Sequence, residues 1–343
     1  MNCTPLISVI MPVYNGAQYL RPAIDSILKQ SFQNFEFLII DDCSTDDTVN
    51  IITSYNDKRI HLTSSSVRLK LAGALNLGIQ NAKGEFIARM DADDISAPER
   101  LQFQIDFFRR NEDVGICGSW IQLFPEIKAP VQTYPTHPDA VHALSLFHSP
   151  FAHPSVMIRR SWFQQHDLLY DVNFYPTEDF DLWCRALTHF KGANINKVLL
   201  QYRVHKQSLT GSDWSNMDEQ AARITQRALH TLKLPEDIET GRYHRKVAMV
   251  QIDQTAEELN RAASWLTTLI EANLKENIYS HTALAETIED LWYRICMHCA
   301  TTGTWSFKFF LQQRFHFSRL TTCKHIFILS ASCIKHALKR RIA

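Results

Sequence analysis

The sequence predicts an α/β protein whose first part is built on a parallel, Rossmann-like sheet. Short apolar runs alternate with segments of helical periodicity over the first hundred residues, the connections between them are short, and polar clusters follow three of the apolar runs. The continuous β-prone run at residues 7–13 is typical of a strand that is buried on both faces of a parallel sheet. We therefore expect ligands at the carboxyl ends of the strands.

The individual elements follow from this periodicity. Strands are predicted over residues 7–13, 35–40, 60–63 and 85–90, and helices over residues 19–30, 71–82 and 98–111. Ser44 or Thr45 is expected to cap a further short helix between the second and third strands. Residues 114–210 are rich in proline and are predicted to form a mixed region with a few strands. From about residue 216 the pattern is helical, with a boundary near residues 212–225.

The composition is that of a folded chain. Of the 343 residues, 45% are apolar or aromatic, and the 10 glycines and 12 prolines are too few for a collagen-like or low-complexity protein. Thirty-six basic residues balance 36 acidic ones, so the overall charge does not favour nucleic-acid binding, and no nucleic-acid partner is expected. The balance is uneven, because residues 291–343 carry nine bases and no acid.

The eight cysteines are expected to be reduced, because a chain of this length can bury a core without disulfides. Cys296 and Cys299 have the spacing of a zinc or redox pair, but no second such pair exists, and helical spacing of their neighbours favours a buried helix face. No basic residue precedes the apolar run at residues 6–13, so no signal peptide is expected. The uncharged stretch at residues 140–158 contains histidines and prolines and is a poor membrane span. A cytoplasmic protein is predicted.

An acidic cluster, Asp91, Asp93 and Asp94, follows the fourth predicted strand. Three carboxylates in four residues repel one another unless solvent or a cation neutralises them, and Mg²⁺ and Mn²⁺ prefer such oxygen ligands. The alternative is an acidic cap on the helix that follows. An EF-hand is excluded, because Ser96 and Gln102 stand where that motif requires glycine and glutamate.

Two other polar clusters end strands at the same predicted edge. Asp42 can accept a hydrogen bond from a ribose hydroxyl or a base N–H, and its alternative is a turn or helix cap. Tyr14 can stack on a nucleobase or simply fill the sheet edge. Glycine-rich phosphate loops are absent from the sequence, so a phosphate ligand needs another countercharge, which a metal at Asp91–Asp94 supplies.

Further carboxylates and histidines lie downstream. A carboxylate such as Asp179, close to the aromatic Trp183, can be desolvated, which raises its pKa and suits a general base. The alternative, which is compatible with it, is an acidic helix start. His153 and His205 are two of fifteen histidines, and either one alone is more typical of a structural role.

Taken together, these segments resemble the family 2 inverting glycosyltransferases of the GT-A fold, in their non-processive bacterial form. Each motif alone is weak, but the set occurs in the family's order over residues 6–210. The matching segments are PVYN at 12–15, DDCSTD at 41–46, ALNLGI at 74–79, ARMDADD at 88–94, PERL at 98–101, HPS at 153–155, EDFDLW at 178–183 and YRVH at 202–205.

The resemblance implies a mixed, mainly parallel sheet flanked by helices and a role for each matching residue. The nucleotide would be bound by Pro12, Val13, Tyr14, Asp42, Asn76 and Asp91, with Asp91 near the ribose. Asp93 would ligate Mn²⁺ or Mg²⁺ at the diphosphate, and His205 would be a second contact. Asp179 would be the catalytic base, and Glu178 and Trp183 would belong to the acceptor region.

The implied activity is transfer of one sugar, with inversion, from a nucleotide sugar to a saccharide or lipid-linked saccharide. A UDP-sugar is the expected donor, and surface polysaccharide or lipopolysaccharide assembly the expected context. The Gln-x-x-Arg-Trp signature of processive polymerases is absent after Asp179, and Leu168-Leu169 replaces a glycine pair common in the acceptor region. The alternatives are an inactive nucleotide-sugar-binding protein and a haloacid-dehalogenase-type phosphotransferase, which leaves Asp42 and Asp179 unexplained.

The resemblance also organises the chain. A catalytic domain is expected over residues 1–215, with a nucleotide-binding half at 1–112 and an acceptor half at 113–215, followed by a helical extension at 216–343. The basic, aromatic tail at residues 305–343 either lies on an anionic membrane surface, at the inner face of the cell membrane, or packs as a helical subdomain. Its longest charge-free stretch, ten residues at 325–334, is too short to span a bilayer.

Overall fold

The structure of the protein is a computed structural model. It describes residues 4–125, 130–205, 214–301, 304–313, 315 and 325–333. The chain divides into two compact units, of which the first comprises Met1–His142 and Ser149–Gln220 and the second Ala143–His148 and Ala221–Ala343. The tail predicted at residues 305–343 is therefore described only in part.

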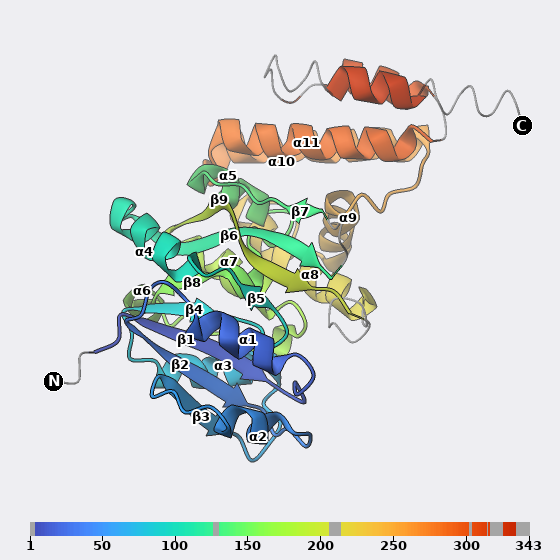
Figure 1. Ribbon diagram of the computed structural model, residues 1–343. Coiled ribbons are helices and arrows are strands. Elements are labelled where there is room, and N and C mark those ends of the chain that lie inside the picture. The colour runs from blue at the N-terminus through green and yellow to red at the C-terminus, as the bar shows by residue number, and fades with distance from the viewer. Residues whose placement is uncertain are drawn as a thin grey trace, which may run out of the picture. The chain divides into compact units, whose positions relative to one another are not determined.

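The first unit is built on a mixed sheet of nine described strands (Figure 1). They are β1 (Ile7–Val13), β2 (Phe35–Asp41), β3 (Ile60–Ser64), β4 (Phe86–Arg89), β5 (Ile95–Ser96), β6 (Val114–Phe124), β7 (Val131–Gln132), β8 (Met157–Arg159) and β9 (Lys191–Arg203). Their order is β3-β2-β1-β4-β8-β6-β9-β5, and β7 pairs with β6. The predicted parallel arrangement of β1 to β4 is confirmed. β8 is antiparallel to both its neighbours, which makes the sheet mixed.

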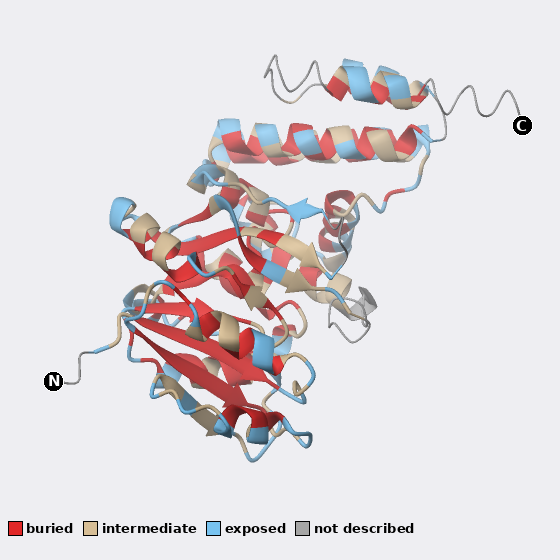
Figure 2. Cartoon of the chain, in the orientation of Figure 1, coloured by how far each residue is buried: buried red, intermediate tan, exposed pale blue. Residues whose placement is uncertain are grey.

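Helices cover both faces of this sheet. On one face lie α1 (Leu20–Leu28), α2 (Thr48–Thr53) and α4 (Arg100–Arg110), and on the other α3 (Lys70–Asn81), α6 (Arg160–Gln165) and α7 (Glu178–Ala186). Alternate side chains of one strand enter the two cores, so Val9 and Met11 face the first set and Ile10 the second. The central strands are consequently buried along their whole length, as Figure 2 shows in red.

The expected cap of α2 is wrong. The helix begins at Thr48, and neither Ser44 nor Thr45 reaches its first turn. Instead, the Asn15 N–H donates to Ser44 Oγ (2.9 Å), and the Thr45 N–H donates to Asn15 Oδ1 (2.8 Å). These two residues therefore tie the loop after β2 to the loop after β1.

The second unit is helical. Its elements are the end of α8 (Trp214–Thr231), α9 (Ile238–Ala248), α10 (Ala256–Glu276), α11 (His281–Cys299), α12 (Trp305–Gln312) and a short helix at residues 325–333. Side chains that prefer the N-cap position open three of them, since Asp237, Thr255 and Ser280 each accept a hydrogen bond from a first-turn N–H. None of the helices in the described ranges is long and apolar enough to cross a membrane.

The core of the second unit includes a segment from elsewhere in the chain. Leu146 and Phe147 are buried in it, and His244 Nε2 forms a hydrogen bond with the Leu146 carbonyl oxygen (2.8 Å). Cys296 and Cys299 lie on the apolar face of α11 and are completely buried. The prediction of a buried helix face for this cysteine pair is confirmed.

Candidate functional site

A cavity of about 930 Å³ opens in the first unit at the carboxyl ends of β1, β2 and β4. These strands are neighbours in the sheet, so the residues after them meet at one edge. Residues from β9 and the start of α7 complete the wall. A volume of this size suits a ligand as large as a nucleoside diphosphate sugar.

Nine of the predicted site residues line this cavity. They are Pro12, Val13, Tyr14, Asp42, Asp91, Asp93, Glu178, Asp179 and His205. They come from segments far apart in the sequence, so their meeting in one cavity depends on the strand order. The roles assigned to them remain predictions.

Asn76 and Trp183 lie elsewhere. The Asn76 side chain donates to the Tyr170 carbonyl oxygen (2.8 Å) and accepts from the Tyr170 N–H (2.9 Å), so its amide holds a loop. Trp183 is fully buried, with its ring centroid 5.7 Å from that of Phe151 and 5.9 Å from that of His153. The structure places both residues behind the cavity wall, where they support it.

The acidic cluster after β4 forms a compact group of oxygens. Carboxylate oxygens of Asp91, Asp93 and Asp94 lie within 4.8 Å of one another. His205 Nε2 lies 2.8 Å from Asp93 Oδ2, because the end of β9 passes beside this turn. Asp94 accepts a hydrogen bond from the Arg203 N–H (2.8 Å), which anchors the turn to β9.

This donor set fits a divalent cation. Carboxylate oxygens with one imidazole nitrogen suit Mn²⁺ and, with fewer protein ligands, Mg²⁺. Burial raises the pKa of Asp94 well above its ordinary value, and the nearby charges of Asp91 and Asp93 raise it further. Asp94 Oδ2 is buried and has no hydrogen-bond partner among the described residues. A cation relieves both the repulsion and the missing contact.

Glu178 and Asp179, at the start of α7, line another part of the cavity. Burial raises the pKa of Glu178 to about 7, and the charge of Asp179 adds to the effect. Glu178 Oε2 is buried without a hydrogen-bond partner in the described chain. Burial also raises the pKa of Asp179, although the Phe180 N–H, Arg89 and Ser149 act in the other direction. The pKa of each carboxyl group is thus closer to neutral pH than that of an exposed carboxyl group, which suits proton transfer.

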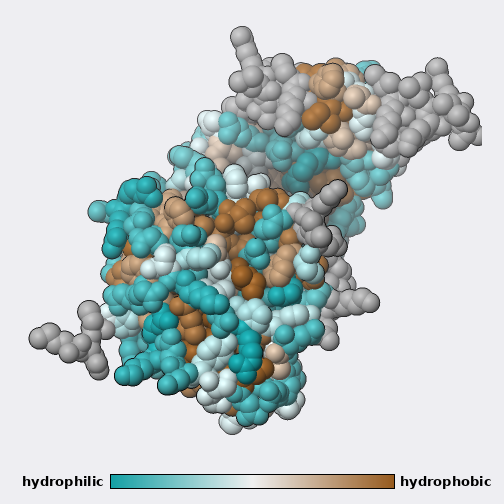
Figure 3. Space-filling model, in the orientation of Figure 1, coloured by the Kyte–Doolittle hydropathy of each residue, from teal (hydrophilic) through white to brown (hydrophobic). Residues whose placement is uncertain are grey.

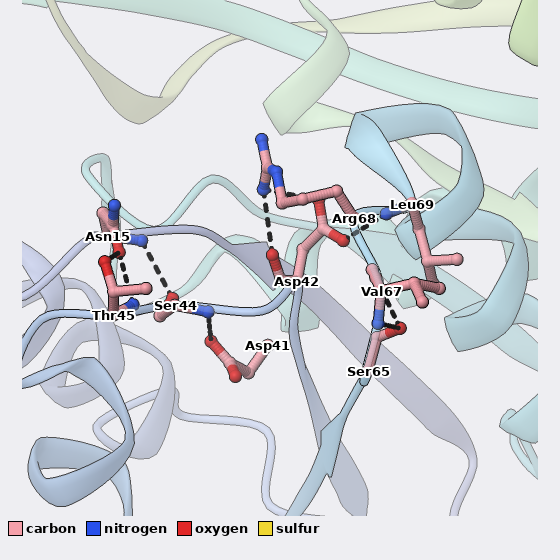
Figure 4. Close-up of polar contacts among 9 residues, drawn as sticks. All are labelled: Asn15, Asp41, Asp42, Ser44, Thr45, Ser65, Val67, Arg68 and Leu69. Atoms are coloured by element: carbon pink, nitrogen blue, oxygen red, sulfur yellow. Dashed lines mark hydrogen bonds and ion pairs between the residues drawn. The ribbon is translucent and has the colours of Figure 1, made fainter.

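Two arginines that were not among the predicted site residues also line the cavity, and the first is Arg68. Its Nη1 donates to Asp42 Oδ2 (2.7 Å) and to the Asp42 carbonyl oxygen (2.9 Å), as Figure 4 shows. The guanidinium carbon lies 3.3 Å from the centroid of the Tyr14 ring. The Leu69 N–H donates to the second carboxylate oxygen of Asp42 (2.5 Å). The available signal was a basic residue shortly after β3, at the same sheet edge as Asp42.

The second is Arg89, at the end of β4. Its guanidinium is buried and bonds to both carboxylate oxygens of Asp91. A basic residue inside an otherwise apolar strand was the signal that could have found it, because unpaired arginines are almost never fully buried.

The chain matches known proteins over much of its length. The model "Glycosyl transferase family 2" matches residues 8–167. The "Putative glycosyltransferase EpsE" of Bacillus subtilis (strain 168) is 32% identical, over 68% of this chain and 86% of that protein. The "O-antigen biosynthesis glycosyltransferase WbnJ" of Escherichia coli is 33% identical, over 59% of this chain and 81% of the relative.

Solved structures share the fold at low identity. The crystal structure of S. aureus TarS 1-349 in complex with UDP-GlcNAc has a TM-score of 0.58 and 16% identity, over 96% of this chain and 91% of that one. The mannosyltransferase PcManGT from Pyrobaculum calidifontis, in complex with GDP-Man and Mn²⁺, has a TM-score of 0.54 and 16% identity, over 98% and 88%. With these matches and this architecture, the chain belongs to glycosyltransferase family 2 and is an enzyme with the GT-A fold.

Proposed function

We propose that this glycosyltransferase transfers one sugar from a nucleoside diphosphate sugar to a hydroxyl group of a saccharide, with inversion and with a divalent cation. The observation that supports it is that Asp42, Asp93 and Asp179, which are remote in sequence, line a single cavity. This distribution provides one carboxylate each for the nucleobase, for the cation at the diphosphate and for the acceptor hydroxyl group. It also argues against an inactive binding protein, which needs no buried carboxylates at the acceptor wall.

The donor base is bound at the rim. Tyr14 is 46% exposed and offers a ring face for stacking, while Asp42 accepts and Arg68 donates hydrogen bonds. Uracil presents an N–H beside a carbonyl oxygen and matches this pair. Guanine presents the same two groups, so a GDP-sugar is the competitor of the proposed UDP-sugar. TarS with UDP-GlcNAc and PcManGT with GDP-Man are neighbours of each kind.

Asp93 and His205 would hold the cation, with Asp91 and Asp94 beside it. When bound, the cation supplies positive charge to a diphosphate, which makes the nucleoside diphosphate a better leaving group. Asp93 and His205 already lie within hydrogen-bond distance of each other, so little rearrangement is needed for both side chains to bind one cation.

Asp179 is the base of the transfer. An acceptor hydroxyl oxygen attacks the anomeric carbon, the bond from that carbon to the diphosphate oxygen breaks, and Asp179 takes the hydroxyl proton. A single displacement inverts the anomeric centre. Because burial raises the pKa of Asp179, its carboxylate is a stronger base than an exposed aspartate. Glu178, beside it, hydrogen-bonds an acceptor hydroxyl.

The acceptor is a saccharide or lipid-linked saccharide of a surface polysaccharide. The name of the relative WbnJ places that protein in O-antigen biosynthesis, which supports this choice.

The proposal is tested with the purified full chain, UDP- and GDP-sugars, and Mn²⁺, Mg²⁺ or a chelator. Release of nucleoside diphosphate and its loss with the chelator are expected. Asp179→Asn is expected to lower transfer on the order of 10²- to 10⁴-fold while nucleotide binding is unchanged. Asp113→Asn, at an exposed surface pair with Lys191, is the matched control. Unchanged turnover in Asp179→Asn refutes its role, and no turnover with any donor leaves the binding-protein alternative.

The C-terminal part of the second unit supports a position on an anionic membrane surface. Phe327 is 75% exposed on the helix at residues 325–333, with Ile328 beside it, and Leu311 and Lys308 are exposed on α12. Figure 3 shows hydrophobic side chains at the surface among the described residues of this C-terminal part. Of the basic residues predicted at 305–343, only Lys308 lies within the described residues. Exposed aromatic and basic side chains favour anionic lipid.

Flotation with phosphatidylglycerol and phosphatidylcholine vesicles tests this position. The full chain is expected to float with the anionic vesicles and Phe327→Glu to float less. Val172→Glu, at an exposed apolar residue of the first unit, is the control. If Phe327→Glu and Val172→Glu float equally, the proposed membrane-binding surface is refuted.

A further inference from the structure

Arg89 is the buried cation of the cavity. Of the lysines and arginines among the described lining residues, Arg68 and Lys70 are exposed, whereas Arg89 is buried at the end of β4. Removing a guanidinium from water costs several kcal/mol unless a partner compensates for it. The position of Arg89, directly before the acidic cluster, therefore calls for a reason.

The first reason is its contact with Asp91. Arg89 Nη1 lies 2.5 Å from Asp91 Oδ2, and Nη2 lies 2.5 Å from Oδ1. Such a fork fixes the plane of a carboxylate, which a single ammonium does not. Each carboxylate oxygen has two lone pairs, so Asp91 still has acceptor capacity on the cavity side. Arg89 Nε is buried without a hydrogen-bond partner among the described residues, so the contact engages the two terminal nitrogens.

The second reason is its charge, because Arg89 and Asp179 line the same cavity. Arg89 lowers the pKa of Asp179 and of Glu178, against the larger effect of burial. The other groups that act on the pKa of Asp179, or whose own pKa responds to its charge, are the Phe180 N–H, Ser149, Glu178, Asp91, Tyr134 and Tyr170. Arg89 is the cation that acts on Asp179. The titratable groups in the list are carboxyl groups and tyrosine hydroxyls, which are neutral or negatively charged.

Arg100 shows what a buried arginine with a different role looks like. It is fully buried, its Nη2 donates to the Arg89 carbonyl oxygen (2.6 Å), and its Nε bonds to Gln104 Oε1 (3.2 Å). Burial lowers the pKa of Arg100 to about 9, and the charge of Arg89 acts in the same direction. Arg100 holds the end of β4 and is absent from the cavity lining.

We propose that Arg89 is a positioning residue for the transfer, which fixes the Asp91 carboxylate for the donor and supplies the positive charge that keeps Asp179 available as a base. The inference rests on the proposed function. It assigns two separable tasks to one side chain, the fork and the charge, and two substitutions distinguish them.

Arg89→Lys keeps the charge and loses the fork, and Arg89→Met loses both. With a donor that the wild type uses, KM for the donor is expected to rise about tenfold in both variants. The acidic limb of the kcat–pH profile is expected to stay in place in Arg89→Lys and to move up by about one pH unit in Arg89→Met. If Arg89→Met does not fold, Arg89→Gln, which is also neutral, replaces it. Arg100→Lys is the control, expected to lower stability without moving the limb.

A second readout does not need turnover. In metal-free protein, ¹³C NMR of the Asp179 carboxyl group, assigned with Asp179→Asn, is expected to show titration at higher pH in Arg89→Met than in the wild type. If the kcat–pH profile and the Asp179 titration of Arg89→Met are the same as in the wild type, the inference is overturned while the proposed function stands. A wild type that releases no nucleoside diphosphate refutes the proposed function, and the NMR titration then still decides the charge of Arg89.

Discussion

The cavity contains two arginine–aspartate pairs whose arginines differ in their access to water. At the rim, the Arg68 side chain is 43% exposed and pairs with Asp42 (2.7 Å). At the floor, the Arg89 side chain is 6% exposed and pairs with Asp91 (2.5 Å). The residue types are the same, so the surroundings decide what each pair does.

The rim pair can exchange partners. Arg68 is partly exposed and can give up its place on the Tyr14 ring to a ligand, while the buried Asp42 carboxylate keeps the hydrogen bond from the Leu69 N–H. The floor pair cannot exchange partners in this way, because separating it leaves the buried Arg89 guanidinium without a partner and without water. The rim is therefore suited to recognition and the floor to fixed orientation.

The largest expected effect is on stability, and it compares the two arginines directly. Arg89→Met leaves the carboxylates of the floor without their buried cation and is expected to lower the free energy of unfolding by about 3–5 kcal/mol. Arg68→Met, the same substitution at the rim, is expected to cost less, about 1–3 kcal/mol, because the buried Asp42 carboxylate keeps the hydrogen bond from the Leu69 N–H. Urea unfolding followed by circular dichroism measures both. Equal losses contradict the distinction between rim and floor.

The second effect is the pH dependence of stability caused by Glu178. Its pKa is raised from the ordinary 4.5 to about 7 by burial, so the unfolded chain releases this proton at lower pH than the folded protein. The stability that the neutral carboxyl group contributes is complete below about pH 4.5 and is lost as the pH rises to about 7.

Glu178→Gln does not titrate, so its stability relative to the wild type should rise over this interval, to roughly 3 kcal/mol at most. Thermal unfolding between pH 4.5 and 8 measures this difference in stability between Glu178→Gln and the wild type. Glu112→Gln, at an exposed position, is the control and is expected to show no such gap. A constant difference across this pH range is evidence against a buried, neutral Glu178.

The smallest expected effect is at the rim. Tyr14→Ala removes the stacking face and is expected to weaken binding of UDP with Mn²⁺ on the order of tenfold, because stacking of one base is worth about 1–3 kcal/mol. Tyr14→Phe retains the ring and should bind nearly as the wild type. Calorimetry measures both affinities, and equal weakening in the two variants assigns the effect to the hydroxyl group instead.

Much of the fold and part of the site could be predicted from local pattern. The buried runs at β1 and β2 and the acidic residues after β4 indicated a parallel sheet, and parallel strands bring their carboxyl ends to one edge. Asp42 and Asp93 could be found in this way. Ser44 and Thr45 could not be placed correctly, because their hydrogen bonds go to Asn15, which is close in space and distant in sequence.

The supporting residues were assigned less well for the same reason. Asn76 and Trp183 belong to matching motifs, but the backbone of Tyr170 and a cluster of rings occupy them. The sequence places Arg68 at the same sheet edge as Asp42, but only the structure pairs the two side chains and brings the start of α7 to the cavity at the end of β4.

The sequence by itself determined the alternation of strands and helices and the chemistry available at the strand ends, because periodicity and residue type are local properties. The tertiary structure alone decided which charges meet, which are buried and how far each pKa moves. These quantities depend on distance and solvent access, and both arise only when β4, β9 and α7 pack around one cavity.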